Sequence, residues 1–269
     1  MKKALSSVWF AVILLLIYIP IFILAVYSFT DATIVGGHVG GFSFENYANL
    51  FKNEELRNMI GGTVLLALGS ALIATILATF GAIGSFYSKR LLKSSINAAN
   101  QIPVVNADVV TGFSVCILLI ILLRIPKDSF VPLVIGHVVL CAPFVYLNIL
   151  PKLKQLDNNL YEAALDLGAT PAQALFKVVL PQLIPGILSG FMLAVTLSLD
   201  DYFITTYTKP STFDTISTYV VNATKGSQTE IKTALWALST AIFVIVVAVV
   251  VAMNVISNKR KENGNEKKK

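Results

Sequence analysis

Residues 160–181 read LYEAALDLGATPAQALFKVVLP, and the interpretation of the whole chain starts from this stretch. Its first eight residues form a helical run, and Gly168 follows where many helices end in a left-handed residue. Thr170, Pro171 and Gln173 then supply an N-cap, a proline at the first helical position and the glutamine of a capping box. The stretch therefore predicts two helices joined by a tight turn. Its many alanines leave room for the backbone of another protein to approach closely.

Long apolar segments lie on both sides of this helical hairpin. Of the 269 residues, 55% are hydrophobic and only 13% are charged, whereas soluble domains average about 25% charged. A membrane-spanning helix needs about 20 apolar residues. Six segments have this character, near residues 8–29, 60–87, 95–124, 129–151, 183–206 and 233–258. We therefore predict an all-α integral membrane protein with six transmembrane helices in a domain over residues 1–258.

The basic residues predict the orientation of these helices. With the N-terminus in the cytoplasm, 14 of the 21 Lys and Arg residues lie on the cytoplasmic side and 7 lie outside. Cytoplasmic loops of membrane proteins carry such an excess. We expect both termini to be cytoplasmic, together with the loop 152–182 and a solvated basic tail, 259–269. The net charge of +6 then reflects orientation in the bilayer, and we expect no nucleic-acid binding.

Three aspartates interrupt the apolar segments. Asp108 lies in the third, and Asp200 and Asp201 lie in the fifth, where Ser198, Asp201 and Thr205 recur on one helical face. A carboxylate at the bilayer centre costs roughly 2.5–3.5 kcal/mol, so it should face protein or a water-filled cavity. Because no Lys or Arg occurs in the middle of any predicted span, a cationic substrate would supply the missing charge. Asp108, Ser198, Asp200 and Asp201 are therefore candidates for a substrate path.

Structural interpretations of the same residues remain open. Asp108 follows Pro103, which should break the third helix, so Asp108 can instead cap the restarted helix. Asp200 and Asp201 can hydrogen-bond between two subunits. His137 is alone in an apolar span, where a hydrogen-bonded packing residue is commoner than a ligand.

The sequence gives little support for metal binding, nucleotide binding or catalysis by this chain. The two His and two Cys residues are scattered without the spacing of a metal site, so we expect no bound metal. No Gly-x4-Gly-Lys-Ser/Thr segment is present, and we expect no ATP or other cofactor on this chain. Asp200 and Asp201 are adjacent and point about 100° apart on a helix, which disfavours the dyad of an intramembrane aspartyl protease. We expect a protein that is not an enzyme.

The opening stretch resembles the EAA loop of permease subunits in bacterial ABC importers. That motif reads Glu-Ala-Ala-x3-Gly-x9-Ile-x-Leu-Pro, and the chain departs from it only in having Val178 at the Ile position. The matching positions are Glu162, Ala163, Ala164, Gly168, Leu180 and Pro181. In the family, this loop is a coupling helix that inserts into a cleft of the ATPase subunit. The resemblance implies that role for Glu162, Ala163, Ala164 and Gly168.

A closer resemblance, to PotC-type permeases of spermidine/putrescine importers, covers nearly the whole chain. It is carried by Asn-Ala-Asp-Val-Val at 106–110, His137 with Cys-Ala-Pro-Phe at 141–144, and Thr-Leu-Ser-Leu-Asp-Asp at 196–201. It implies a type I ABC importer permease fold in the bacterial plasma membrane, translocating polyamines by alternating access. The implied partners are two copies of an ATPase that holds ATP-Mg, a second and paralogous permease, and an extracellular or periplasmic polyamine-binding protein.

Two alternatives stay open at this point. A neighbouring permease family would carry another substrate, such as thiamine or ferric iron. An ion-coupled carrier or a channel with six spans would share the hydropathy, but it has no need of a capped cytoplasmic docking hairpin.

Overall fold

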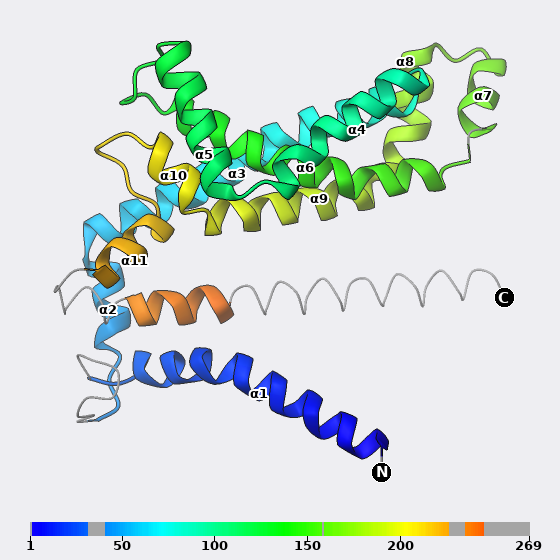
Figure 1. The fold of residues 1–269 in the computed structure, drawn as a ribbon. Helices are drawn as coiled ribbons and strands as arrows, with labels where there is room; N and C mark the ends of the chain where they lie inside the picture. The colour runs from blue at the N-terminus through cyan, green and yellow to red at the C-terminus, as the bar shows by residue number, and fades with distance from the viewer. Residues whose placement is uncertain (1, 32–40, 158, 226–234, 245–269) are drawn as a thin grey trace. The chain divides into compact units, whose positions relative to one another are not determined.

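The computed structural model describes residues 2–31, 41–157, 159–225 and 235–244, and their regular structure is helical (Figure 1). An isolated antiparallel bridge joins Thr30 to Phe42. The chain forms two compact units, one from residues 1–57 and 222–269 and the other from residues 58–221. The predicted tail 259–269 and the end of the sixth apolar segment lie outside the described residues.

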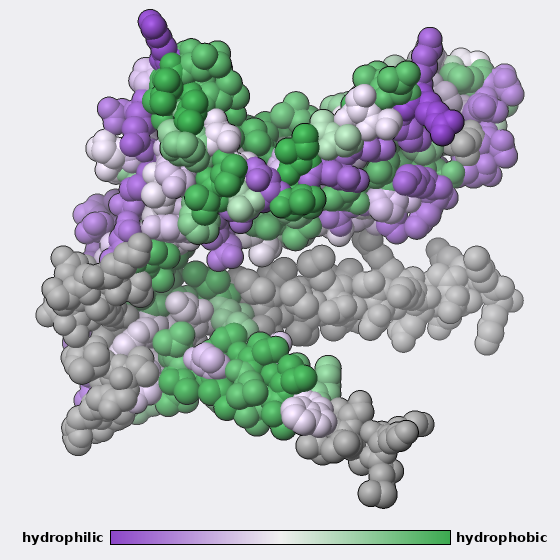
Figure 2. All heavy atoms as spheres, viewed as in Figure 1, coloured by the Kyte–Doolittle hydropathy of each residue, from purple (hydrophilic) through white to green (hydrophobic). Residues whose placement is uncertain are grey.

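The first unit contains the long apolar helix α1 (Lys2–Ser28), the short amphipathic helix α2 (Glu45–Lys52) and a short apolar helix, Leu235–Val244. From Trp9 onward the side chains of α1 are largely exposed in the isolated chain, and Figure 2 shows that most of them are hydrophobic. Asn46 of α2 is buried and donates its side-chain amide to the carbonyls of Ser28 and Thr30, which fixes α2 against the end of α1. Trp236 packs edge-to-face on Tyr27 at 5.8 Å.

The remaining helices belong to the second unit. Two of them cross into the first unit, because α3 begins there and α11 ends there. In chain order the remaining helices are α3 (Glu54–Phe86), α4 (Arg90–Val105), α5 (Asp108–Cys116), the π-helical η1 (Ile117–Leu122), α6 (Val131–Gln155), α7 (Asn159–Asp166), α8 (Pro171–Ala174), the π-helical η2 (Leu175–Val179), α9 (Leu180–Asp200), α10 (Phe203–Thr208) and α11 (Ile216–Lys225).

Four helical segments in the described residues are long and apolar enough to cross a membrane. They are Trp9–Ser28, Glu54–Phe86, Val131–Gln155 and Pro171–Asp200. The pair Arg90–Val105 and Asp108–Leu122, bent by 109°, makes a fifth if it forms one broken span. A shorter apolar helix covers Leu235–Val244. The described residues thus contain four or five of the six predicted spans in helical form.

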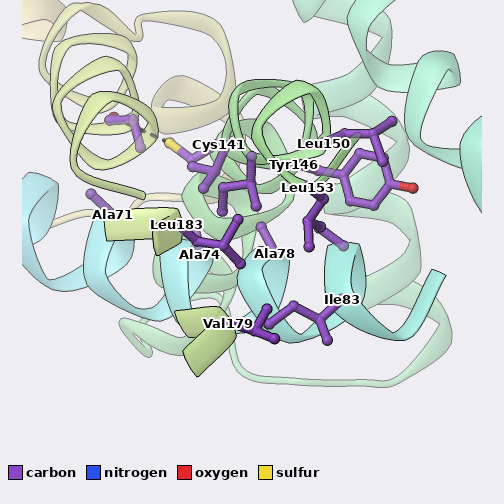
Figure 3. Close-up of a cluster of buried hydrophobic side chains, with 14 residues drawn as sticks. Ala71, Ala74, Ala78, Ile83, Cys141, Tyr146, Leu150, Leu153, Val179 and Leu183 are labelled. Carbon is purple, nitrogen blue, oxygen red and sulfur yellow. Dashed lines mark hydrogen bonds between the residues drawn. The ribbon is translucent and has the colours of Figure 1, made fainter. Parts of the chain in front are cut away.

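The core of the second unit lies where α3, α6 and α9 meet (Figure 3). The buried side chains of α3 include a stripe of alanines at helical spacing: Ala67, Ala71, Ala74, Ala78 and Ala82. On α6 larger side chains fill the space, among them Tyr146, Ile149 and Leu153, each at most 2% exposed. Small residues on one helix let the backbones approach, as is usual between membrane helices.

The hydroxyl group of Tyr146 connects three helices at one end of this core. It donates to Asn97 Oδ1 of α4 at 2.6 Å and lies 2.9 Å from Ser85 Oγ of α3. A buried tyrosine needs such partners because an unpaired hydroxyl in an apolar core is costly. The middle of α4 is thereby anchored to α3 and α6.

Two broken spans determine the geometry of the second unit. The sequence predicts a break at Pro103, but α4 runs through this proline, and the extended residues are Asn106 and Ala107, with ψ of 148° and 138°. The second break lies at Asp201, which has an extended ψ of 126° and separates α9 from α10. Each break is followed by a short helix, α5 or α10, and these two helices pack on each other.

Gly112 makes the contact between α5 and α10 possible. A Cβ atom at Gly112 would lie 3.1 Å from Ile204 Cα and 3.2 Å from Ile204 N, both backbone atoms of α10. We therefore expect Gly112→Val to destabilise the protein by about 1–3 kcal/mol, the usual cost of overpacking. The measurement is the thermal unfolding midpoint in detergent. Gly81→Val is the matched control, since nothing lies within 4 Å of a Cβ there. Equal midpoints for both variants would contradict this account of the contact.

Candidate functional site

The first candidate site is the helical hairpin formed by α7 and α8. Gly168 has φ of +87°, a conformation that favours glycine. Its N–H donates to the carbonyl of Leu165, and the N–H of Ala169 donates to the carbonyl of Ala164, which together make a Schellman motif. Thr170 and Gln173 form the reciprocal hydrogen bonds of a capping box. Both features confirm the local structure predicted from the sequence.

The tip of this hairpin is exposed, and its base is attached to α3. Glu162 and Ala163 are exposed on α7, and Leu167, an apolar residue beside the turn, is 88% exposed. At the base, the ring of Tyr161 packs on Tyr87 at 5.4 Å, just beyond the end of α3. Figure 2 shows hydrophilic side chains around α7. The hairpin is thus a polar projection that is held at its base by aromatic contacts.

The second attachment of the hairpin is the ring of Phe176, which packs on Phe80 of α3 at 6.5 Å. Phe176 belongs to η2, a π-helical turn that leads directly into α9. The hairpin region therefore makes one aromatic contact with α3 and one with Tyr87 just beyond its end, and it is continuous with α9.

The second candidate site comprises the acidic residues at the two broken spans. Asp108 is exposed and lies in the first turn of α5, after the N-cap Ala107, and its side chain makes no capping hydrogen bond. Asp200 is exposed and is the last residue of α9. Its backbone carbonyl accepts a hydrogen bond from Ser217 Oγ at 3.1 Å. Among the described residues, neither carboxylate forms an ion pair with a Lys or Arg.

Asp201 has a different environment from its neighbour. It is 8% exposed, and its carboxylate turns onto the N-terminus of α10. Oδ1 accepts from the N–H of Ile204 at 3.2 Å, and Oδ2 accepts from the N–H and the hydroxyl of Thr205 at 2.7 and 2.8 Å. Such hydrogen bonds satisfy backbone donors that a helix start leaves without intrahelical partners. Asp201 therefore caps α10.

His137 lies at the centre of a buried polar cluster that includes Ser198, Asp201 and Thr205. Its side chain is fully buried in α6. Nδ1 lies 2.7 Å from Ser198 Oγ of α9, and Nε2 lies 3.1 Å from Thr205 Oγ1 of α10. Nε2 is also 3.9 Å from Asp201 Oδ2. We call these four residues the His137 cluster. His137 is a hydrogen-bonded packing residue, as expected from the sequence.

The four predicted path residues thus occupy different settings. Ser198 and Asp201 come together in the His137 cluster, whereas Asp108 and Asp200 are exposed at helix ends. The sequence reasoning missed the role of Thr205 and the central position of His137. A signal was present, because a lone polar residue on one span and a polar face on another can satisfy each other. The described residues contain no group of three or more potential metal ligands.

Comparison with known proteins identifies the family. Residues 73–263 match the family described as "Binding-protein-dependent transport system inner membrane component". The chain belongs to this family. The putrescine transport system permease protein PotI of Escherichia coli (strain K12) is 35% identical over 214 residues, 75% of this chain and 74% of that protein. The spermidine/putrescine transport system permease protein PotC of the same strain is 29% identical over 250 residues, 93% of this chain and 92% of PotC.

Solved structures agree with this assignment at the level of the fold. A bacterial ABC transporter involved in the import of the acidic polysaccharide alginate superposes with a TM-score of 0.67 at 14% identity, covering 94% of this chain and 95% of that chain. The chain is therefore a multi-pass permease subunit of the plasma membrane, and ATP hydrolysis resides in a partner subunit. Permeases of this family work with an ATPase, a second permease and a binding protein. An ion-coupled carrier or a channel is thereby excluded.

Proposed function

We propose that this permease imports polyamines and that Asp200 provides the main contact with the cationic cargo. The observation that carries the proposal is the exposed carboxylate at the C-terminal end of α9, within an apolar span. The C-terminus of a helix carries partial negative charge, so an acidic residue there is unfavourable unless a cation is near. A polyamine ammonium group supplies that cation. Relatives named for putrescine and spermidine support the same choice of cargo.

The charged residues in the sequence around the two breaks also favour a cationic cargo. Neither residues 94–123 nor residues 178–208 contain a Lys or Arg. An anion importer needs positive groups along its path. Asp108 is exposed at the head of α5, where the helix dipole stabilises its negative charge. We propose that Asp108 makes a secondary contact with the cargo. Ser198 and Asp201 would instead stabilise the structure of the path from within the buried His137 cluster.

For the architecture we propose six spans within residues 1–258, with both termini and the hairpin in the cytoplasm. The helix Leu235–Val244 would be part of the sixth span, 233–258, followed by the basic tail 259–269. In this arrangement the basic residues that flank the hairpin, Lys152, Lys154 and Lys177, lie on the cytoplasmic side, where loops of membrane proteins carry an excess of Lys and Arg.

We further propose that α7 is the coupling helix and docks on one of two copies of an ATPase that holds ATP-Mg. The exposed Glu162 and Ala163, the half-buried Ala164 and the turn at Gly168 form the docking surface. Movement of α7 reaches the rest of the permease through Tyr161 on Tyr87 and through η2 into α9. The remaining partners are a paralogous permease and an external polyamine-binding protein, and this chain itself binds no cofactor.

Reconstitution tests the proposal. The permease is placed in proteoliposomes with its partner ATPase, second permease and binding protein, and uptake of labelled putrescine and spermidine is measured. We expect uptake that requires ATP inside the vesicles and persists when the membrane potential is clamped. Thiamine and ferric iron serve as competing cargoes. Uptake of either of them without uptake of a polyamine would show that the cargo assignment is wrong.

A further inference from the structure

His137 bridges the break between α9 and α10. One ring nitrogen contacts Ser198 in the last turn of α9, at 2.7 Å, and the other contacts Thr205 in the first turns of α10, at 3.1 Å. These two partners lie on opposite sides of the extended residue Asp201. A single side chain of α6 thus holds both halves of the broken span.

The hydrogen bonds of the cluster run in one direction. The Thr205 hydroxyl donates to Asp201 Oδ2, so its oxygen is left to accept from Nε2–H of His137. A neutral imidazole has one donor and one acceptor, so Nδ1 then accepts from the Ser198 hydroxyl. This assignment of the tautomer follows from the network. The chain of donors ends on the Asp201 carboxylate.

Asp201 is consequently unavailable to the cargo. Its two oxygens accept three hydrogen bonds from Ile204 and Thr205, and its side chain is 4% exposed. The preceding residue, Asp200, is exposed, and its backbone carbonyl accepts a hydrogen bond from the Ser217 hydroxyl. Because the two aspartates are adjacent, the constraint on Asp201 also determines where Asp200 lies.

We propose that His137 is a positioning residue that fixes the α9–α10 break through Ser198 and Thr205 and thereby places Asp200 on the cargo path. This inference rests on the proposed function, and it adds a residue that acts on the cargo only through Asp200. It also separates the roles of the two aspartates, with Asp201 maintaining the break and Asp200 meeting the cargo.

A double-mutant cycle tests the proposal in the reconstituted transporter. The variants are His137→Leu, Asp200→Asn and the double variant, with maximal putrescine uptake measured at saturating binding protein. We expect each single change to lower uptake at least tenfold, and the double variant to be no slower than Asp200→Asn alone, because residues that act as a unit are not additive. His137→Gln, which keeps a donor and an acceptor, should restore most of the uptake.

The matched control is Cys141→Ala. Cys141 lies one turn from His137 on α6, is also fully buried, and donates to the carbonyl of Ala194 on α9 rather than to the break. It should keep near-normal uptake. A double variant whose loss equals the product of the two single losses would refute the positioning role, as would wild-type uptake in His137→Leu.

A second measurement does not depend on the cargo. In a Cys116→Ser and Cys141→Ala background, Asp200→Cys is modified with a charged, membrane-impermeant thiol reagent. We expect His137→Leu to change the modification rate at least threefold, while co-purification with the ATPase is retained. An unchanged rate would overturn the inference even if putrescine is imported. Absence of polyamine uptake by the wild-type complex, with the rate changed, would instead overturn the proposed function and leave the role of His137 in the break intact.

Discussion

Asp200→Asn is expected to reduce putrescine uptake at least tenfold while leaving the complex assembled. The change removes the negative charge at the end of α9 but keeps the size of the side chain. Hydrogen bonds to charged groups contribute about 1.5–3 kcal/mol, and each 1.4 kcal/mol corresponds to a factor of ten. The measurement is ATP-driven uptake in proteoliposomes at equal amounts of incorporated complex.

Two controls accompany this variant. Asp200→Glu keeps the charge and should retain a substantial part of the uptake. Asp128→Asn changes an exposed carboxylate that accepts a hydrogen bond from Ser211, away from both breaks, and should transport normally. Asp108→Asn should also reduce uptake. Wild-type rates in both Asp200→Asn and Asp108→Asn would rule out a cation path along these residues.

Gly168→Val should uncouple ATP hydrolysis from transport. A β-branched residue is strained at the φ of +87° that this turn requires, and a residue held in such a region costs of order 1–3 kcal/mol. The Schellman hydrogen bonds from Gly168 and Ala169 would then be lost, and α7 would leave its position on the ATPase. The measurement is the ratio of putrescine molecules imported to ATP molecules hydrolysed, which we expect to fall at least fivefold.

Ala172→Val provides the comparison for this variant. Ala172 is exposed in α8, in a right-handed helical segment, so the same side chain causes no strain from a positive φ there. It should leave the ratio near the wild-type value. A normal ratio in Gly168→Val, with both variants assembled, would show that the conformation of the turn does not carry the coupling.

The hairpin could be predicted residue by residue because its structure depends on local interactions. A left-handed glycine, an N-cap threonine and a glutamine three residues later act over one helical turn, and each is visible in the sequence. The first break shows the opposite case. Pro103 is the residue that a sequence reading singles out, yet α4 continues to Val105 and the extended residues are Asn106 and Ala107. A proline costs one hydrogen bond, and packing around it decides whether the helix stops.

The different environments of Asp200, which is exposed, and Asp201, which is buried and caps α10, could not be predicted in the same way. The two residues are adjacent in the same apolar segment, so the sequence does not distinguish them. No glycine or proline marks the break between α9 and α10. The difference arises from His137, which lies more than 60 residues away in the sequence and meets Ser198 and Thr205 only in the folded chain. Long-range hydrogen bonds of this kind leave a weak trace in a single sequence.

The alanine stripe on α3, which includes Ala71, Ala74 and Ala78, bears on the movements that transport requires. Along this stripe α3 presents only methyl groups, which are too short to interlock with the next turn of the neighbouring helix. A small rotation or slide of α3 along α6 therefore disrupts few contacts, whereas leucines would first have to leave the spaces they fill. We expect this smooth surface to lower the free-energy barrier between the two conformations of the permease, so that enlarging any of these alanines would slow turnover even where it increased stability.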